Sequence, residues 1–236
     1  MWQHPYWRTV VECGPPNYRL QLTARFFLAE RPQLKRSVRR AYLEKKENGY
    51  MGRTVHQLKV TLRGTSPPIW RRIMVYSDIT LYAFHEILQV VMGWTDSHLH
   101  HYRVRDTYYG KPDDGFGMRR QNEKKVRLNE VLRKPKDRMV YEYDFGDGWE
   151  HDVVLEKVDV PQAGEKYPFV LKGKRACPPE DVGGVWGYYH FLEVIGNPDH
   201  PEHKDMAEWC EGFDADEFDI NEINCYFHVG WRKKDA

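Results

Sequence analysis

Two histidines separated by one residue, His98 and His100, are the first feature of this sequence that could do chemistry. If residues 99–105 form a strand, side chains two positions apart point to the same face. Two imidazoles on one face are a common start to a metal site. The structural alternative is a pair of strand histidines that hydrogen-bond neighbouring carboxylates or carbonyls and do nothing else.

Further metal-ligand candidates lie around a Gly-Asp-Gly turn. Asp144 and Asp147 offer hard oxygen ligands, and His151 adds a third imidazole. Three or four of these side chains converging would bind a divalent metal, zinc or, with more oxygen ligands, manganese or iron. An open coordination position would allow activation of water. Asp147 between two glycines is also an ordinary turn residue.

A loop rich in proline and glycine supplies the candidates for catalysis, Cys177, Glu180 and Asp181. Cys177 would be a nucleophile if a neighbouring base lowered its pKa and a histidine such as His151 were positioned beside it. Glu180 or Asp181 would be the general base of a metal-dependent hydrolase. The alternative is a structural loop that covers an edge of the core.

Basic residues near the N-terminus are the candidates for nucleic-acid binding. They recur at about one-turn spacing in a predicted helix over residues 33–47, where they could contact phosphates. They are Lys35, Arg36, Arg39, Arg40, Lys45 and Lys46. The alternatives are a solvated helix face or a face that pairs with an acidic region.

Charge is distributed unevenly along the chain. Met1 to Arg53 carries a net charge of +7, and His190 to Glu222 carries −10, within a total of +1. Such asymmetry indicates a basic arm and an acidic face for partners, or two ends that attract each other. A structural module that pairs with another protein through its acidic helical end is therefore one hypothesis.

The elements that must position these residues are mostly strands followed by helices. Alternation and turn signals predict strands over residues 58–62, 69–76, 99–105, 139–145, 151–158 and 167–172, and a last one over 225–231. Helices are predicted over 81–92, 186–195 and 203–210, with a helical turn at 128–132 and a loop at 106–125. Asp78 or Thr80 would cap the first helix and Gly93 would end it.

Most connections between the predicted strands are too short for parallel crossovers. We therefore expect an α+β fold, with a mixed or mainly antiparallel sheet and helices packed on one side. Residues 1–50 read as a small N-terminal extension with a strand or hairpin and a basic helix, and residues 51–236 as the α+β domain. Trp70, Trp94, Trp149 and Trp186 are expected in the core or lining a pocket.

Composition favours a folded protein. Hydrophobic residues make up 41% of the chain and aromatic residues 14%, which is enough apolar surface to form a core. No apolar run reaches the ~18 residues of a membrane span, and no C-x-x-C pair is present among the four cysteines. We expect a cytoplasmic protein with no membrane partner.

Four motifs in order make this chain similar to the Ri-plasmid ORF-three-like family, over residues of about 54–224. The motifs are PPIWRR at 67–72, Trp94 with HLH at 98–100, YEYDFGDGWEH at 141–151, and CPPEDVGG at 177–184, followed by Gly187-Tyr188. The resemblance implies a compact α+β protein that travels with plasmids and mobile elements. Members also carry the label of a TnpR-type passenger protein of insertion elements, yet the sequence shows no recombinase pattern.

Three functions are therefore open. The first is a mobile-element accessory module that binds nucleic acid or a protein–nucleic acid complex. The second is a metal-dependent hydrolase that uses the His/Asp cluster, with zinc or manganese. The third is the protein-interaction module. The sequence leaves undecided whether the protein is an enzyme.

Overall fold

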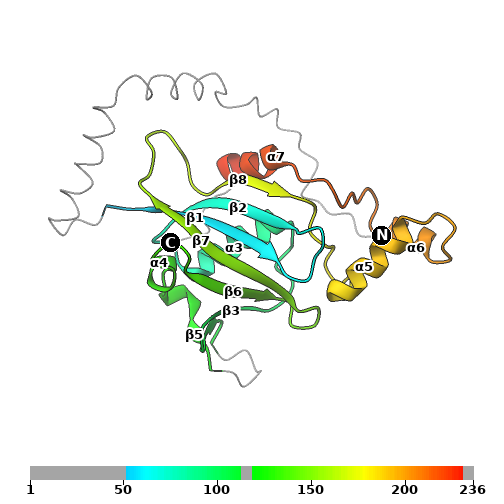
Figure 1. The fold of residues 1–236 in the computed structure, drawn as a ribbon, viewed down its shortest axis with the longest axis horizontal. Helices are drawn as coiled ribbons and strands as arrows, with labels where there is room; N and C mark the ends of the chain where they lie inside the picture. Colours follow the sequence, from blue (N-terminus) through cyan, green and yellow to red (C-terminus); the bar gives the residue numbers. More distant parts are fainter. Residues whose placement is uncertain (1–51, 113–118, 231–236) are drawn as a thin grey trace. The chain divides into compact units, whose positions relative to one another are not determined.

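The structure, a computed structural model, describes residues 52–112 and 119–230 (Figure 1). The chain divides into two units, Met1–Gly52 and Arg53–Ala236, and the described residues fall almost wholly in the second. The basic residues predicted to bind nucleic acid, from Lys35 to Lys46, lie outside the described residues.

One sheet of eight strands forms the framework of this unit, in the order β5-β4-β3-β6-β7-β1-β2-β8. Its strands are β1 Val55–Leu62, β2 Trp70–Tyr76, β3 His100–Val104, β4 Thr107–Gly110, β5 Gln121–Asn122, β6 Arg138–Tyr143, β7 Trp149–Asp159 and β8 Phe169–Lys174. The pairs are antiparallel except β4 with β5. Short connections explain the antiparallel pairs β1–β2, β3–β4 and β6–β7, because a parallel pair needs a long crossover.

Alternation along the strands gives the sheet one apolar and one polar face. On β7, Val153 and Leu155 are fully buried, whereas Asp152, Val154 and Glu156 are partly exposed. The polar face carries ion pairs across strands: Arg63 contacts Glu150 at 2.6 Å and Arg72 contacts Glu156 at 2.6 Å. Such a pattern is typical of an antiparallel sheet with one solvated face.

Helix α3, Leu81–Met92, covers the apolar face as the sequence predicts. The Thr80 side chain accepts a hydrogen bond from the Ala83 backbone N–H and caps the first turn. Gly93 ends the helix at a φ of 81°, where a residue without a Cβ has no steric cost. Tyr102 of β3 donates to the Leu81 carbonyl at 2.9 Å and joins the helix to the sheet.

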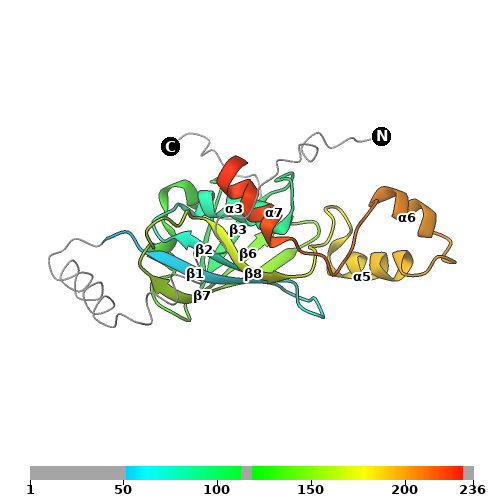
Figure 2. The same cartoon turned by 90° about the horizontal axis from the view of Figure 1, so that it is seen from above.

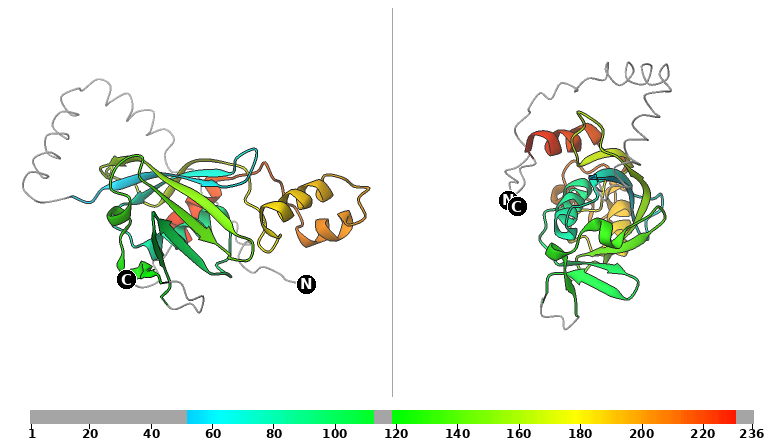
Figure 3. Two further views of the ribbon diagram at one scale, coloured as in Figure 1. Left: turned by 60° about the horizontal axis from the view of Figure 1, so that its bottom comes forward. Right: turned by 90° about the vertical axis from the view of Figure 1, so that its left-hand side faces the viewer.

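Four shorter helices complete the described unit: α4 Leu128–Val131, α5 Gly184–Ile195, α6 His203–Trp209 and α7 Ile220–Cys225, with a 3-10 turn η1 at Glu123–Lys125. Helices α3 and α7 lie on the same side of the sheet (Figure 2). Helices α5 and α6 pack against each other beyond the end of the sheet (Figure 3). The expected α+β fold, a mainly antiparallel sheet with helices, is thereby confirmed.

Some local predictions are wrong. In the predicted strand at 225–231, the described residues do not form a strand, because α7 continues into a π-helical turn, η2 Tyr226–Gly230. The predicted loop at 106–125 contains β4 and β5. Trp186 is 88% exposed because it lies on the solvent side of α5, whereas Trp94 and Trp149 are buried as expected.

No helix among the described residues is long and apolar enough to cross a membrane.

Helix α5 begins against the preceding loop so closely that Gly187 has no room for a side chain. A Cβ at this position would lie 1.9 Å from the Val182 carbonyl oxygen. We predict that Gly187→Ala lowers the free energy of unfolding by about 1–3 kcal/mol through overpacking, measured by urea denaturation. Glu193→Ala, at an exposed position of the same helix, is the control and should change it by less than about 0.5 kcal/mol. Equal effects of the two variants would refute this account.

Candidate metal centre

Three of the predicted site residues converge at the end of β6. His98 Nε2 lies 3.1 Å from Asp181 Oδ1 and 3.6 Å from Asp144 Oδ2. One ligand atom from each residue lies within 4.8 Å of those of the other two. An imidazole nitrogen and two carboxylate oxygens at this spacing can bind one divalent cation.

The Nε2 atom of His98 is one of several shielded side-chain nitrogens among the described residues that have no hydrogen-bond partner. Two carboxylates face this atom, but neither contact has hydrogen-bond geometry. A buried polar atom without a partner is costly and calls for an explanation such as an ion. A cation between the three side chains would satisfy this nitrogen and offset the repulsion between the carboxylates.

The backbone around the two aspartates is held in a sparsely populated conformation. Asp144 has a φ of 57° and Asp181 a φ of 61°, in the left-handed region that side chains rarely adopt. Asp144 Oδ1 accepts the backbone N–H of Gly146 at 2.9 Å, which leaves Oδ2 facing His98. Asp96, Arg105, Lys136 and Arg175 adopt the same region, so the conformation alone does not mark a site.

Contacts between two loops bring Asp144 and Asp181 together. The side chain of Asp147, in the β6–β7 turn, accepts the Gly183 backbone N–H at 3.1 Å. Gly184 lies so close that a Cβ would be 2.5 Å from the Asp147 carbonyl oxygen. Asp147, a predicted metal ligand, is thus used to join the loops.

Glu180 is fully engaged in hydrogen bonds. Oε1 accepts from the Tyr143 hydroxyl at 2.5 Å, and Oε2 accepts from the backbone N–H of Thr95 at 3.1 Å and from the Thr95 hydroxyl. Burial, together with the negative charge of Glu180, raises the pKa of Tyr143 far above its ordinary value, so the hydroxyl stays a donor. These contacts suit Glu180 to a supporting role rather than to that of a general base.

The structure separates His100 from His98. Strand β3 begins at His100, so the premise that both histidines share a strand face is wrong. His100 lies in a second cluster with His85 and Asp96, and its Nε2 is 2.8 Å from the buried carboxylate of Glu123.

Hydrogen bonds fix the proton positions in this second cluster. The Asp96 backbone N–H donates to Gln89 Oε1, so the amide nitrogen of Gln89 donates to the Tyr141 hydroxyl. That hydroxyl must then donate to His85 Nδ1, and His85 Nε2 carries the hydrogen that Asp96 accepts at 2.8 Å. Burial lowers the pKa of His85 and keeps it neutral. Both ring nitrogens of His85 are therefore satisfied without a metal.

Ring geometry also opposes a cation in the second cluster. The imidazoles of His85 and His100 stack with centroids 3.4 Å apart and planes at 7°. The lone pairs of two parallel rings run side by side and do not converge on one ion. The sequence signals for this cluster are His85 on the apolar face of a helix and Asp96 just after it, and neither is among the predicted site residues.

His151 and Cys177 lie in the core. His151 is fully buried, and its Nδ1 is 3.3 Å from the Tyr141 carbonyl oxygen. Cys177 is 3.3 Å from both the Arg71 guanidinium and the Met92 sulfur. Burial raises the pKa of the Cys177 thiol, against a smaller opposing effect of Arg71. A shielded thiol with a raised pKa is a poor nucleophile.

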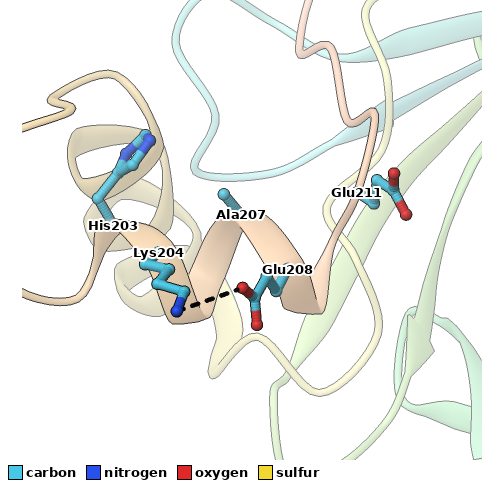
Figure 4. Close-up of a pocket in the computed structure, with 5 residues that line it drawn as sticks. All are labelled: His203, Lys204, Ala207, Glu208 and Glu211. Carbon is cyan, nitrogen blue, oxygen red and sulfur yellow. Dashed lines mark ion pairs between the residues drawn. The ribbon is translucent and has the colours of Figure 1, made fainter. Parts of the chain in front are cut away.

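Two surface hollows lie elsewhere in the described region. The first, of about 490 Å³, runs along α6 between His203 and Glu211, with Lys204 facing Glu208 at 3.9 Å (Figure 4). The second, of about 550 Å³, lies on the polar sheet face, where Arg103 and Glu150 already pair. Neither includes a member of the His98–Asp144–Asp181 cluster, so we do not regard them as the site.

The fold and this cluster define a small α+β protein with a candidate metal centre on loops at one end of its sheet. The chain matches the family described as plasmid pRiA4b ORF-3-like protein over residues 54–222. It therefore belongs to this plasmid-associated family, as the motifs predict.

Two relatives agree with this assignment. The uncharacterized protein y4hQ of Sinorhizobium fredii is 42% identical over 164 residues, which cover 69% of this chain and 84% of that protein. The crystal structure of the protein of unknown function MM3350 from Methanosarcina mazei Go1 matches with a TM-score of 0.66 and 37% identity. The match covers 73% of this chain and 98% of the Methanosarcina mazei chain.

Burial of His151 gives the folded protein a pH-dependent stability. Burial lowers the pKa of His151 from 6.5 to about 4, so on acidification the unfolded chain binds a proton before the folded protein does. His151 therefore destabilises the fold as pH falls from 6.5 toward 4. We predict that His151→Leu gains about 2 kcal/mol relative to wild type between pH 7 and pH 4.5, measured by urea denaturation. A constant difference between the two proteins across this range would contradict the prediction.

Proposed function

We propose that this protein is a metal-dependent hydrolase whose divalent cation is bound by His98, Asp144 and Asp181. The observation that carries the proposal is the shielded Nε2 of His98, which faces two carboxylates without a hydrogen bond. A neutral imidazole and two carboxylates have a net charge of −2, which a divalent cation neutralises. One nitrogen and two oxygen ligands suit zinc or manganese.

Access from solvent favours catalysis over a purely structural metal. Structural zinc sites are closed by four protein ligands, whereas catalytic sites keep a position for water. Here the cluster offers three ligands, and the side chain of Asp181 is 71% exposed. A metal in this position would lower the pKa of a bound water. Activation of water is the chemistry that a metal held by His98, Asp144 and Asp181 would supply to the hydrolysis of an ester.

Nucleic-acid binding stays a separate proposal. It rests on the basic residues Arg36, Arg39 and Arg40 and on the plasmid association of the family. Charge reversal at these three positions should weaken a salt-dependent shift of DNA or RNA across all sequences. A wild-type protein that shifts neither nucleic acid would end this proposal.

A protein-interaction role is supported by one structural observation. Trp186 is 88% exposed on α5, and Trp209 on α6 is 52% exposed. Eleven acidic side chains and one lysine lie between His190 and Glu222, and all twelve are exposed. Exposed aromatic residues are enriched at interfaces, and this charge suits a basic partner.

The metal proposal predicts different results for the two histidines that the sequence grouped together. Wild-type protein refolded with Zn²⁺ or Mn²⁺ should retain about one equivalent, measured by plasma mass spectrometry after desalting, because three ligands converge. His98→Ala should weaken binding by more than about 100-fold, since loss of even an outer-shell partner costs 10–100-fold. His100→Ala is the matched control and should retain the metal.

Metal loss in His100→Ala with retention in His98→Ala would show that the other cluster is the site. Hydrolysis is then tested with 4-nitrophenyl acetate, 4-nitrophenyl phosphate and bis(4-nitrophenyl) phosphate. We expect turnover of at least one ester by the metal-loaded wild type and none by His98→Ala. A loaded wild type that is inactive on all three would leave a metal-binding protein and reject this hydrolase assignment.

A further inference from the structure

One hydroxyl group joins the three chain segments that carry the proposed metal ligands. The Tyr143 oxygen accepts the backbone N–H groups of Ser97 at 3.0 Å and His98 at 3.3 Å, and its own hydrogen goes to Glu180 Oε1. These contacts use both the accepting and the donating capacity of the phenol.

Each proposed ligand is at, or directly next to, one of these contacts in the chain. Asp144 follows Tyr143, Asp181 follows Glu180, and the His98 backbone itself donates to the hydroxyl. The Tyr143 hydroxyl therefore fixes the end of β6, the loop before β3 and the loop before α5 relative to one another.

Packing holds the ring of Tyr143 in place. It stacks on Trp94 with centroids 5.0 Å apart and meets the His98 ring edge to face at 5.8 Å. Trp94 in turn donates from its indole nitrogen to the Pro178 carbonyl oxygen at 3.0 Å. The hydroxyl is thus presented by a rigid, buried side chain and not by a mobile one.

We infer that Tyr143, together with Glu180, is a positioning residue that sets the metal affinity of the His98–Asp144–Asp181 site. The inference rests on the proposed function. Residues that orient metal ligands through hydrogen bonds typically contribute 10–100-fold to metal affinity. A tyrosine that only filled the core would contribute to stability and leave affinity unchanged.

Tyr143→Phe tests this inference because it removes the hydroxyl and keeps the ring. We expect a 10–100-fold weaker Kd for Mn²⁺ by titration calorimetry and a changed visible absorption spectrum of the Co²⁺-loaded protein. The matched control is Tyr102→Phe, which also loses one buried hydrogen bond, to the Leu81 carbonyl oxygen. It should keep the wild-type Kd and Co²⁺ spectrum.

Glu180→Gln adds a second, independent measurement. If the carboxylate acts through Tyr143, the double variant Tyr143→Phe/Glu180→Gln should lose clearly less affinity than the product of the two single losses. Independent roles would give the full product and overturn the assignment of a shared function.

The outcomes separate the inference from the proposed function. Wild-type protein that binds neither Mn²⁺ nor Co²⁺ would refute the metal site itself. Wild-type protein that binds both ions, with Tyr143→Phe matching Tyr102→Phe in Kd and spectrum, would refute the positioning role and leave the site standing.

Discussion

The close approach of two loops is the constraint on which the candidate site depends. The Asp147 carboxylate holds the Gly183 N–H at 3.1 Å, and no Cβ fits between Gly184 and the Asp147 backbone. Asp144 and Asp181 lie on these two loops, 37 positions apart in the sequence. Because the β6–β7 turn is fixed by antiparallel pairing from Tyr143 with Trp149 onward, the sheet supplies a rigid base for the contact. Loops on such a scaffold commonly carry function.

Hydrogen bonding distinguishes two histidine clusters that share residue types. In the cluster of His85 and His100, the backbone N–H of Asp96 fixes the orientation of the Gln89 amide, and this orientation determines the donor and acceptor in each hydrogen bond that follows. The Nε2 atom of each histidine lies 2.8 Å from a carboxylate oxygen. In the other cluster the Asp181 carboxylate lies 3.1 Å from His98 Nε2 but without hydrogen-bond geometry. A satisfied buried network rigidifies a core, whereas an unsatisfied buried nitrogen costs free energy unless a ligand compensates it. Residue type alone does not separate these cases.

Local sequence signals predicted much of the fold and two members of the candidate site. The Thr80 cap, the Gly93 stop and the turn at residues 146–148 are local, and the structure has them as expected. Grouping His98 with Asp144 needed only their motifs. The structure alone indicates Asp181 as a third candidate ligand, because the packing of two loops brings it to His98. It also separates His100 and His151 from the cluster, through the start of β3 and the side chains of β7 that face the core. Strand register and loop packing depend on residues far apart in the chain, so a short stretch of sequence does not predict them.

The same geometry has an energetic consequence for the folded protein. Three features of the cluster cost free energy in the folded protein. They are the left-handed backbone at Asp144 and Asp181, the two carboxylates that face each other, and the His98 nitrogen without a hydrogen bond. The buried apolar face of the eight-stranded sheet must offset these costs. A cation that binds only the folded chain would return stability in proportion to its concentration over Kd. The Tyr143 hydroxyl affects this coupling between metal binding and stability. It already holds the ligand-bearing loops in place, so binding of an ion carries a smaller entropic cost of ordering them.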